Sequence, residues 1–127
     1  MKKPHFWLIA LLFLSSSVFS AEPRPNGYDL LDACKKASDY YQTKELIGEI
    51  GAGYCVGVLS TASAFLTTFK DDLPKSMEVC FPEQGVANRE LVRIVKDYLS
   101  DNSSMLQLND IFLVMSALQN AYPCGPD

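Results

Sequence analysis

Apolar residues at helical spacing mark two segments in the last third of the chain. In the first segment they recur at i, i+3, i+4 and i+7, which places them on one face of a helix, and they are Leu91, Ile94, Val95 and Tyr98. The second segment carries a similar stripe, formed by Leu108, Ile111, Met115, Leu118 and Tyr122. The five polar residues 100–104 between them suit a tight connection between antiparallel helices. The pattern predicts a helical hairpin whose apolar side packs on a second layer.

The N-terminal half of the chain is expected to supply that second layer. A helix is predicted over residues 28–41, with one face formed by Leu30, Cys34, Ala37 and Tyr41. Residues 44–69 are the most apolar part of the chain after residue 20, although the glycines at their start weaken a helix there. From Tyr54 onward the segment is apolar around much of its circumference. We therefore expect this helix to be the buried, central one.

Small residues spaced by four along the same segment, at Gly53, Gly57 and Thr61, would let a neighbouring helix approach closely. Residues 70–79 are charged and contain Pro74, which ends a helix, so they are expected to form a connection. No segment shows the period of two that indicates a strand. The predicted fold is therefore all-α, a small bundle of four to five helices.

The first twenty residues have the pattern of an export signal. Lys2 and Lys3 precede an uninterrupted apolar run, residues 6–14, and small residues follow, so cleavage is expected after Ser20. A membrane anchor is the alternative, but a spanning helix needs about 20 apolar residues and this run is shorter. The predicted organisation is a signal peptide over 1–20, a flexible leader over 21–27 and a helical domain over 28–127.

Removal of the signal makes the chain more acidic. The eleven basic residues fall to nine against fifteen acidic ones, which changes the formal net charge from −4 to −6. Nucleic acids and anionic lipids reward clustered lysine and arginine, so neither is an expected partner. An acidic surface suits a basic protein partner, although acidity also simply favours solubility.

Four cysteines in an exported chain of this size indicate two disulfides. Three pairings exist for Cys34, Cys55, Cys80 and Cys124. A helix from Cys55 to Phe69 rises about 21 Å, and the ten steps from Lys70 to Cys80 reach about 33 Å when extended. The connection is therefore long enough to return Cys80 to Cys55, which leaves Cys34 for Cys124. We predict the pairs Cys55–Cys80 and Cys34–Cys124.

The processed chain lacks the groups that most catalytic and metal sites use. Its one histidine, His5, lies in the signal, so neither a histidine base nor a histidine zinc ligand remains. The acids Asp71 and Asp72 stand in a connection, where a solvated role is expected rather than glycosidase chemistry. We expect a binding protein rather than an enzyme, with no catalytic residue, no cofactor and no metal.

Several short motifs follow the signal peptide and a cysteine in the first helix, and they are Tyr54-Cys55-Val56-Gly57, Cys80-Phe81-Pro82, Gly85-Val86, Glu90-Leu91-Val92-Arg93-Ile94-Val95, Tyr98-Leu99, Ala117-Leu118 and Ala121-Tyr122-Pro123-Cys124. Their order and spacing resemble the Rap/Tai family of periplasmic immunity proteins. Members of this family protect bacteria against type VI-secreted amidases that cut peptidoglycan cross-links. Val58, Ala64 and Ala87 depart from the family pattern, and these departures concern the partner more than the fold.

The resemblance implies a periplasmic inhibitor that occludes an amidase active site without chemistry of its own. Such inhibitors push a loop between helices into the toxin's cleft, sometimes as homodimers, so the resemblance leaves a homodimer open here. The matching loop supplies the expected partner-binding residues, which are Asp97, Ser100, Asp101, Asn102, Ser103, Ser104 and Gln107. A solvated helix connector is the alternative interpretation of the same residues.

Other classes of small exported protein fit the sequence less well. A periplasmic helical chaperone of the acid-stress type matches in size and would need no specific partner. A saposin-like membrane binder normally has six cysteines, whereas this chain has four. A small hydrolase is disfavoured by the absence of histidine from the processed chain.

Overall fold

The computed structural model describes residues 23–45 and 48–125, and within these residues the chain is helical. The predicted signal peptide lies outside the described residues. The four α-helices are α1 (Gly27–Thr43), α2 (Glu49–Thr68), α3 (Asn88–Asp101) and α4 (Asp110–Ala121). Two short 3-10 turns, η1 (Lys75–Met77) and η2 (Ser103–Met105), lie in the connections on either side of α3. The prediction of an all-α bundle of four to five helices is confirmed.

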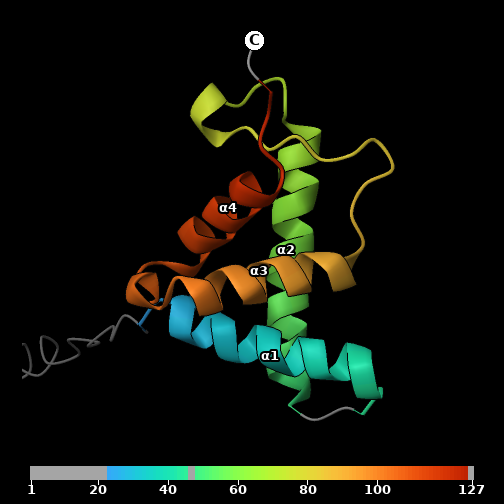
Figure 1. Cartoon of the computed structure of the whole chain (residues 1–127), viewed down its shortest axis with the longest axis vertical. Coiled ribbons are helices and arrows are strands. Elements are labelled where there is room, and N and C mark those ends of the chain that lie inside the picture. The colour runs from blue at the N-terminus through green and yellow to red at the C-terminus, as the bar shows by residue number, and fades with distance from the viewer. Residues whose placement is uncertain (1–22, 46–47, 126–127) are drawn as a thin grey trace, which may run out of the picture.

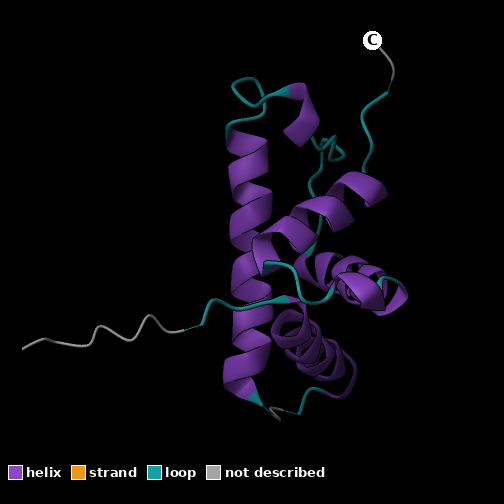
Figure 2. Cartoon of the chain, turned by 90° about the vertical axis from the view of Figure 1, so that its left-hand side faces the viewer, coloured by secondary structure: helices purple, strands orange, loops and turns teal. Residues whose placement is uncertain are grey.

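Helix α2 is the long axis of the bundle (Figure 1). Helices α1 and α3 cross it and α4 lies beside its upper half, and the view turned by 90° shows all three on the same side of α2 (Figure 2). The fold therefore has two layers, one formed by α2 alone and one by α1, α3 and α4. The predicted second layer for the hairpin of α3 and α4 is thus supplied by α2 alone, and α1 lies in the same layer as the hairpin.

The hydrophobic core lies where the three shorter helices meet each other and one side of α2. Its fully buried leucines come from all four helices: Leu30, Leu59, Leu66, Leu91, Leu99, Leu113 and Leu118. The stripe predicted for α3 is confirmed in part, since Leu91 and Val95 are buried and Ile94 and Tyr98 are half-buried. Burial of these side chains supplies the main favourable free energy of the fold.

The stripe predicted for α4 is wrong in part, since Leu118 is buried as predicted and Met115 and Tyr122 are half-buried. Leu108 precedes the helix and Ile111 is half exposed, whereas the buried face consists of Leu113, Val114, Ala117 and Leu118. The buried face is thus turned by about 100°, the angle of one residue, from the predicted one. The reason is that α4 is apolar on two faces, so its periodicity alone does not determine which face packs inward.

The expectation that this helix is the buried, central one is right about its central place and wrong about its burial. Cys55, Leu59 and Leu66 are its buried residues, and the small residues Gly53 and Gly57 are exposed. A Cβ atom added at Gly53 or Gly57 would meet nothing within 4 Å. The small residues therefore do not serve a close approach of helices within the described chain, because only one side of α2 is covered.

Helix α2 is also long and apolar enough to cross a membrane by length and composition alone, and 17% of its most apolar stretch is buried. One such helix is weak evidence for a membrane span, because the test uses length and composition only. A disulfide, a hydrogen bond and the core join α2 to the other three helices. We interpret it as the axis of the bundle.

The predicted disulfide pairs are wrong. The structure joins Cys34 to Cys55, with Cα atoms 5.1 Å apart, and Cys80 to Cys124, with Cα atoms 5.0 Å apart. Cys55 faces α1 near the start of α2, whereas Cys80 lines a cavity together with Leu66 near the other end. The length of the connection showed only that Cys80 could reach Cys55. Because Cys55 already forms its disulfide with Cys34 of α1, Cys80 pairs with Cys124 in the C-terminal segment.

Helix α1 begins inside the predicted leader. The Asn26 side chain accepts hydrogen bonds from the backbone N–H groups of Tyr28 (2.9 Å) and Asp29 (3.4 Å), which is the typical N-cap arrangement. Gly27 is buried, and a Cβ atom there would lie 2.5 Å from a methyl carbon of Leu113 and 2.8 Å from the backbone of Leu106. The last two residues of the leader segment are therefore part of the domain.

Candidate partner-binding surface

The connection between α3 and α4 forms one corner of the molecule, together with the start of α1 (Figure 1). The Gly27 N–H donates to the Leu108 carbonyl at 3.1 Å, and an isolated antiparallel bridge pairs Asn26 with Asn109. We call this region the α3–α4 corner and define it as residues 101–112 with Tyr28. The corner is held at its base by backbone contacts, so its shape is fixed by the fold.

Three of the seven predicted binding residues have side chains engaged within the chain. The Ser100 hydroxyl donates to the Lys96 carbonyl at 2.9 Å, and the Asn102 side-chain amide donates to the Tyr98 carbonyl at 2.8 Å. The Asp97 carboxylate lies 3.7 Å from the Arg93 guanidinium and 3.3 Å from the Lys96 ammonium. Since α3 runs through Asp101, Ser100 is helical rather than part of a loop.

The remaining predicted residues face solvent. Asp101 is the last residue of α3, Ser103 and Ser104 lie in η2, and Gln107 follows it; all four are exposed. No ion pair among the described residues involves the Asp101 carboxylate. The corner therefore presents a negative charge that nothing else in the described chain neutralises.

A row of alternating charges leads along α3 to Asp101. Arg93 forms an ion pair with Glu90 one turn earlier, and this bond lowers the pKa of the Glu90 carboxyl and raises that of the Arg93 guanidinium. The Asp97 carboxylate forms ion pairs with the Arg93 guanidinium and the Lys96 ammonium. The charges at Glu90, Arg93 and Asp97 are thus balanced locally, whereas the Asp101 carboxylate has no ion pair in the described part of the chain.

Exposed apolar side chains lie on the same corner as this charge, although the sequence pattern predicted two of them, Leu108 and Ile111, for a buried stripe. Ile111 is 50% exposed and Phe112 is 53% exposed. Tyr28 and Leu108 are also exposed, and the backbone hydrogen bond from Gly27 to Leu108 places them on the same corner. These four are half of the large apolar side chains that the described residues leave exposed. The available signal was the run of five apolar residues at 111–115, since five consecutive apolar positions cover more than one face of a helix.

The Tyr54 hydroxyl fixes the start of α4. It donates to the Asp110 carboxylate, and the other oxygen of that carboxylate accepts the Ile111 N–H at 2.8 Å. Asp110 is only 6% exposed, and burial followed by the bond to Asp110 raises the pKa of Tyr54. Asn109 caps the same helix end by accepting from Ile111 and Phe112. These bonds turn Asp110 inward, so Ile111 and Phe112 point outward.

The described residues offer little for chemistry. No group of three or more histidine, cysteine, aspartate or glutamate side chains that would suit a metal ion occurs among them. All four cysteines form disulfides, so none is available as a nucleophile. Exposed apolar side chains on the same corner as an acid without an ion pair are instead typical of a protein–protein interface.

A disulfide-braced helical domain with such a corner defines a small protein-binding module. A family model, described as Rap1a immunity proteins, matches residues 26–124. The chain therefore belongs to the Rap1a immunity protein family. The match begins at the residue that caps α1 and ends at the last cysteine, so it covers the folded domain. No curated protein and no solved structure shows significant similarity to the chain.

Membership of this family indicates immunity against a secreted effector, with the effector protein as the binding partner. It also points to a role that does not involve catalysis. The family and the two disulfides together indicate an exported protein.

Proposed function

We propose that this protein is a periplasmic immunity protein that binds a secreted peptidoglycan amidase at the α3–α4 corner and occludes its active site. The observation that carries the proposal is the exposure of Ile111 and Phe112 at a helix end that Tyr54 and Asn109 hold in place. Large apolar side chains fixed on a surface bind without a large loss of their own entropy.

The predicted seven-residue set divides into two roles in this proposal. Asp101, Ser103, Ser104 and Gln107 contact the effector, because their side chains are exposed. Asp97, Ser100 and Asn102 hold the end of α3, because their side chains bind within the chain. Occlusion needs only that the corner fits the cleft and keeps substrate out, so the inhibitor itself supplies no reacting group.

The compartment follows from the substrate of the proposed effector. Peptidoglycan lies outside the cytoplasm, and residues 1–20 have the pattern of a cleavable signal that delivers the chain there. The oxidising conditions of the periplasm suit both disulfides.

A homodimer is part of the proposal, and the exposed side of α2 supports it. From Ile50 to Phe69 this helix has no charged residue, and its exposed side includes Gly53, Gly57 and Thr61. Two such helices would approach closely without burying a charge. The α3–α4 corner includes no residue of α2, so a dimer through α2 keeps both corners available for effectors.

The direct test first looks for the gene of a secreted amidase next to the gene of this chain and uses that amidase as the effector. The exported protein is titrated into that amidase, and cleavage of peptidoglycan cross-links is measured. Ile111→Ser with Phe112→Ser should weaken inhibition at least about tenfold, and Asp101→Ala should weaken it by about two- to fivefold. Asn102 stays unchanged in these variants, because its amide satisfies the end of α3.

A matched control separates the corner from general loss of apolar surface. Ile50 is 92% exposed at the start of α2, so Ile50→Ser removes exposed apolar area elsewhere. This variant should inhibit as well as the unchanged protein. Equal inhibition by the corner variants and the control would refute the corner as the binding surface, and turnover of peptidoglycan by the purified protein alone would refute an immunity role.

A further inference from the structure

A second surface is formed by the C-terminal part of α2 and the segments after it, which lie away from the α3–α4 corner in Figure 1. It is a cavity of about 580 Å³ between the end of α2, the connection that follows it and the non-helical segment 78–86. Cavities of this size accept small ligands or one to two side chains of a bound peptide. None of the residues that line it belongs to the corner described above.

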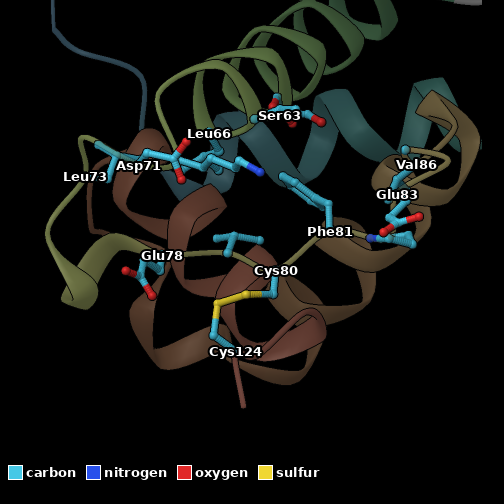
Figure 3. Close-up of a pocket in the computed structure, with 15 residues that line it drawn as sticks. Ser63, Leu66, Asp71, Leu73, Glu78, Cys80, Phe81, Glu83, Val86 and Cys124 are labelled. Carbon is cyan, nitrogen blue, oxygen red and sulfur yellow. A yellow bond between two sulfur atoms is a disulfide. The ribbon is translucent and has the colours of Figure 1, made fainter. Parts of the chain in front are cut away.

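The floor of this groove is apolar and firmly held. Leu66 and Val79 are buried, and the Phe81 ring packs on the Tyr122 ring with centroids 5.2 Å apart. The Cys80–Cys124 disulfide closes one side of the groove, as the close-up shows (Figure 3). The Cys80 N–H also donates to the Tyr122 carbonyl at 3.0 Å. These contacts form the groove before any ligand arrives.

Three carboxylates surround the groove. Asp71 and Glu78 lie at one side of it and Glu83 at the other, with Phe81 between them (Figure 3). In residues 23–45 and 48–125, no cation forms an ion pair with any of these three acids. Lys70 is the one basic side chain of the lining, so the rim is negative. A positively charged ligand therefore complements it, and an anionic one is repelled.

The backbone of segment 78–86 favours a peptide as that ligand. Among the backbone groups of Val79, Cys80 and Phe81, the Cys80 N–H alone has a partner in the described part of the chain. Pro82 and Gly85 then form a turn, closed by the Gly85 N–H at 2.8 Å from the Pro82 carbonyl, and Gly85 has a positive φ of 76° that favours glycine. An extended peptide pairs with such backbone groups and places alternate side chains in the groove.

We propose that this groove, defined by Leu66, Val79, Phe81 and Val86 with the rim of Asp71, Glu78 and Glu83, binds an extended basic segment of a protein partner. One apolar side chain of the segment contacts the floor, and lysine or arginine side chains on either side of it meet the rim. The inference goes beyond the proposed function, because it concerns a separate surface and holds whether or not the partner is an amidase.

The test uses two synthetic peptides with blocked ends. One has the sequence Gly-Lys-Leu-Lys-Gly, and its acidic counterpart has the sequence Gly-Glu-Leu-Glu-Gly. Each is titrated into the isotope-labelled exported protein with both disulfides intact, and backbone amide signals are followed by NMR. The basic peptide should shift the signals of Val79, Phe81 and Val86 in a saturable way that weakens with added salt, and the acidic peptide should not.

Two matched triple variants separate the rim from the net charge. Asp71→Asn, Glu78→Gln and Glu83→Gln together should weaken the basic peptide by about fivefold at low salt. Asp39→Asn, Glu45→Gln and Glu49→Gln remove the same charge from exposed sites near the α1–α2 turn and should leave the affinity unchanged. The variant Ile111→Ser with Phe112→Ser should also bind the peptide normally, so this test does not depend on the corner.

Four results would each overturn the inference. The first is that the groove signals fail to shift at peptide concentrations up to millimolar. The second is that the acidic peptide binds as well as the basic one, and the third is that the control triple variant loses as much affinity for the basic peptide as the rim variant does. In the fourth result the groove signals shift when the protein concentration alone is raised, which would identify a second copy of this chain as the occupant.

Discussion

The Tyr54 hydroxyl donates a hydrogen bond to the Asp110 carboxylate and so joins α2 to the first residue of α4 across 56 positions of sequence. Asp110 is the one charged residue of the described chain that is buried. Its two oxygens are occupied by the Tyr54 hydroxyl and the Ile111 N–H. The pair therefore determines both where α4 begins and which of its two apolar faces turns outward.

Replacing Tyr54 by phenylalanine should destabilise the fold. The change removes one partner of the buried Asp110 carboxylate, and an unsatisfied buried acceptor costs about 1–3 kcal/mol. Urea unfolding followed by circular dichroism measures this loss. Tyr28→Phe is the matched control, because Tyr28 is exposed and its loss should change the unfolding free energy by less than about 0.5 kcal/mol. Equal stability of the two variants would show that the bond contributes nothing.

The same pair predicts a dependence of stability on alkaline pH. Burial and then the bond to Asp110 raise the pKa of Tyr54 above the unfolded value of about 10. At pH values below the unfolded pKa, Tyr54 makes its full contribution to the free energy of unfolding. Above it the unfolded chain releases a proton that the folded chain keeps, so the free energy of unfolding falls as pH rises through the folded pKa.

Unfolding measured from pH 8 to 11 in the wild-type protein and in Tyr54→Phe tests this sign. The free energy of unfolding should fall more steeply with pH in the wild-type protein, with a slope that is larger by up to one proton. Burial also raises the pKa of Tyr122, but this effect is the same in both proteins and does not change the comparison. Parallel curves would contradict the assignment.

The rotation of α4 is testable by comparing neighbouring residues. Leu113 is fully buried, so Leu113→Ala should cost about 2–5 kcal/mol through lost contacts and a cavity. Ile111 is half exposed at the corner, so Ile111→Ala should cost less than about 1 kcal/mol. The stripe read from sequence predicts a large cost at Ile111 instead, and thermal unfolding of the two variants distinguishes them.

The sequence predicted element types better than it predicted faces. The periodicity of α3 identified a buried stripe because its polar residues leave only one apolar face. Helix α4 has five consecutive apolar residues, and α2 is uncharged after Glu49, so neither pattern selects a buried side. Those sides are set by long-range contacts such as Tyr54 to Asp110, which local periodicity does not contain.

For the candidate site, too, the sequence predicted the location better than the side-chain contacts. The position of the corner was predicted from the polar break between two helices and from a family resemblance. The roles of its residues were not, since Asn102 and Ser100 bind carbonyls one turn earlier in α3. Side chains of this kind favour helix ends on local grounds, and sequence alone does not separate that role from binding.

The disulfides should differ in how easily they are reduced. Cys34 and Cys55 are fully buried, whereas Cys80 is exposed, so a mild reductant should open Cys80–Cys124 first. Tryptic digestion without reduction should yield a peptide containing Cys34 joined to one containing Cys55. Recovery of Cys55 joined to Cys80 would restore the pairing predicted from chain reach.

The cost of removing each disulfide should follow burial rather than loop length. The pairs span 21 and 44 positions, and the chain-entropy model gives about 3 and about 4 kcal/mol for loops of those lengths. Alanine at Cys34 and Cys55 also empties part of the core, so that double variant should be the less stable one. Greater loss with alanine at Cys80 and Cys124 would mean that chain entropy dominates.

The exposed side of α2 gives a prediction in which stability and assembly change in opposite directions. A side chain at Gly57 meets nothing within 4 Å in the single chain, so Gly57→Leu should stabilise the monomer by up to about 1 kcal/mol through helix propensity. The same side chain prevents two α2 helices from approaching closely, so it should abolish the proposed homodimer in sedimentation experiments. Ala64→Ser, a change of similar position but small volume, should leave the dimer intact. A dimer that survives Gly57→Leu must use another face, because a leucine between two closely packed helices leaves no room for the contact.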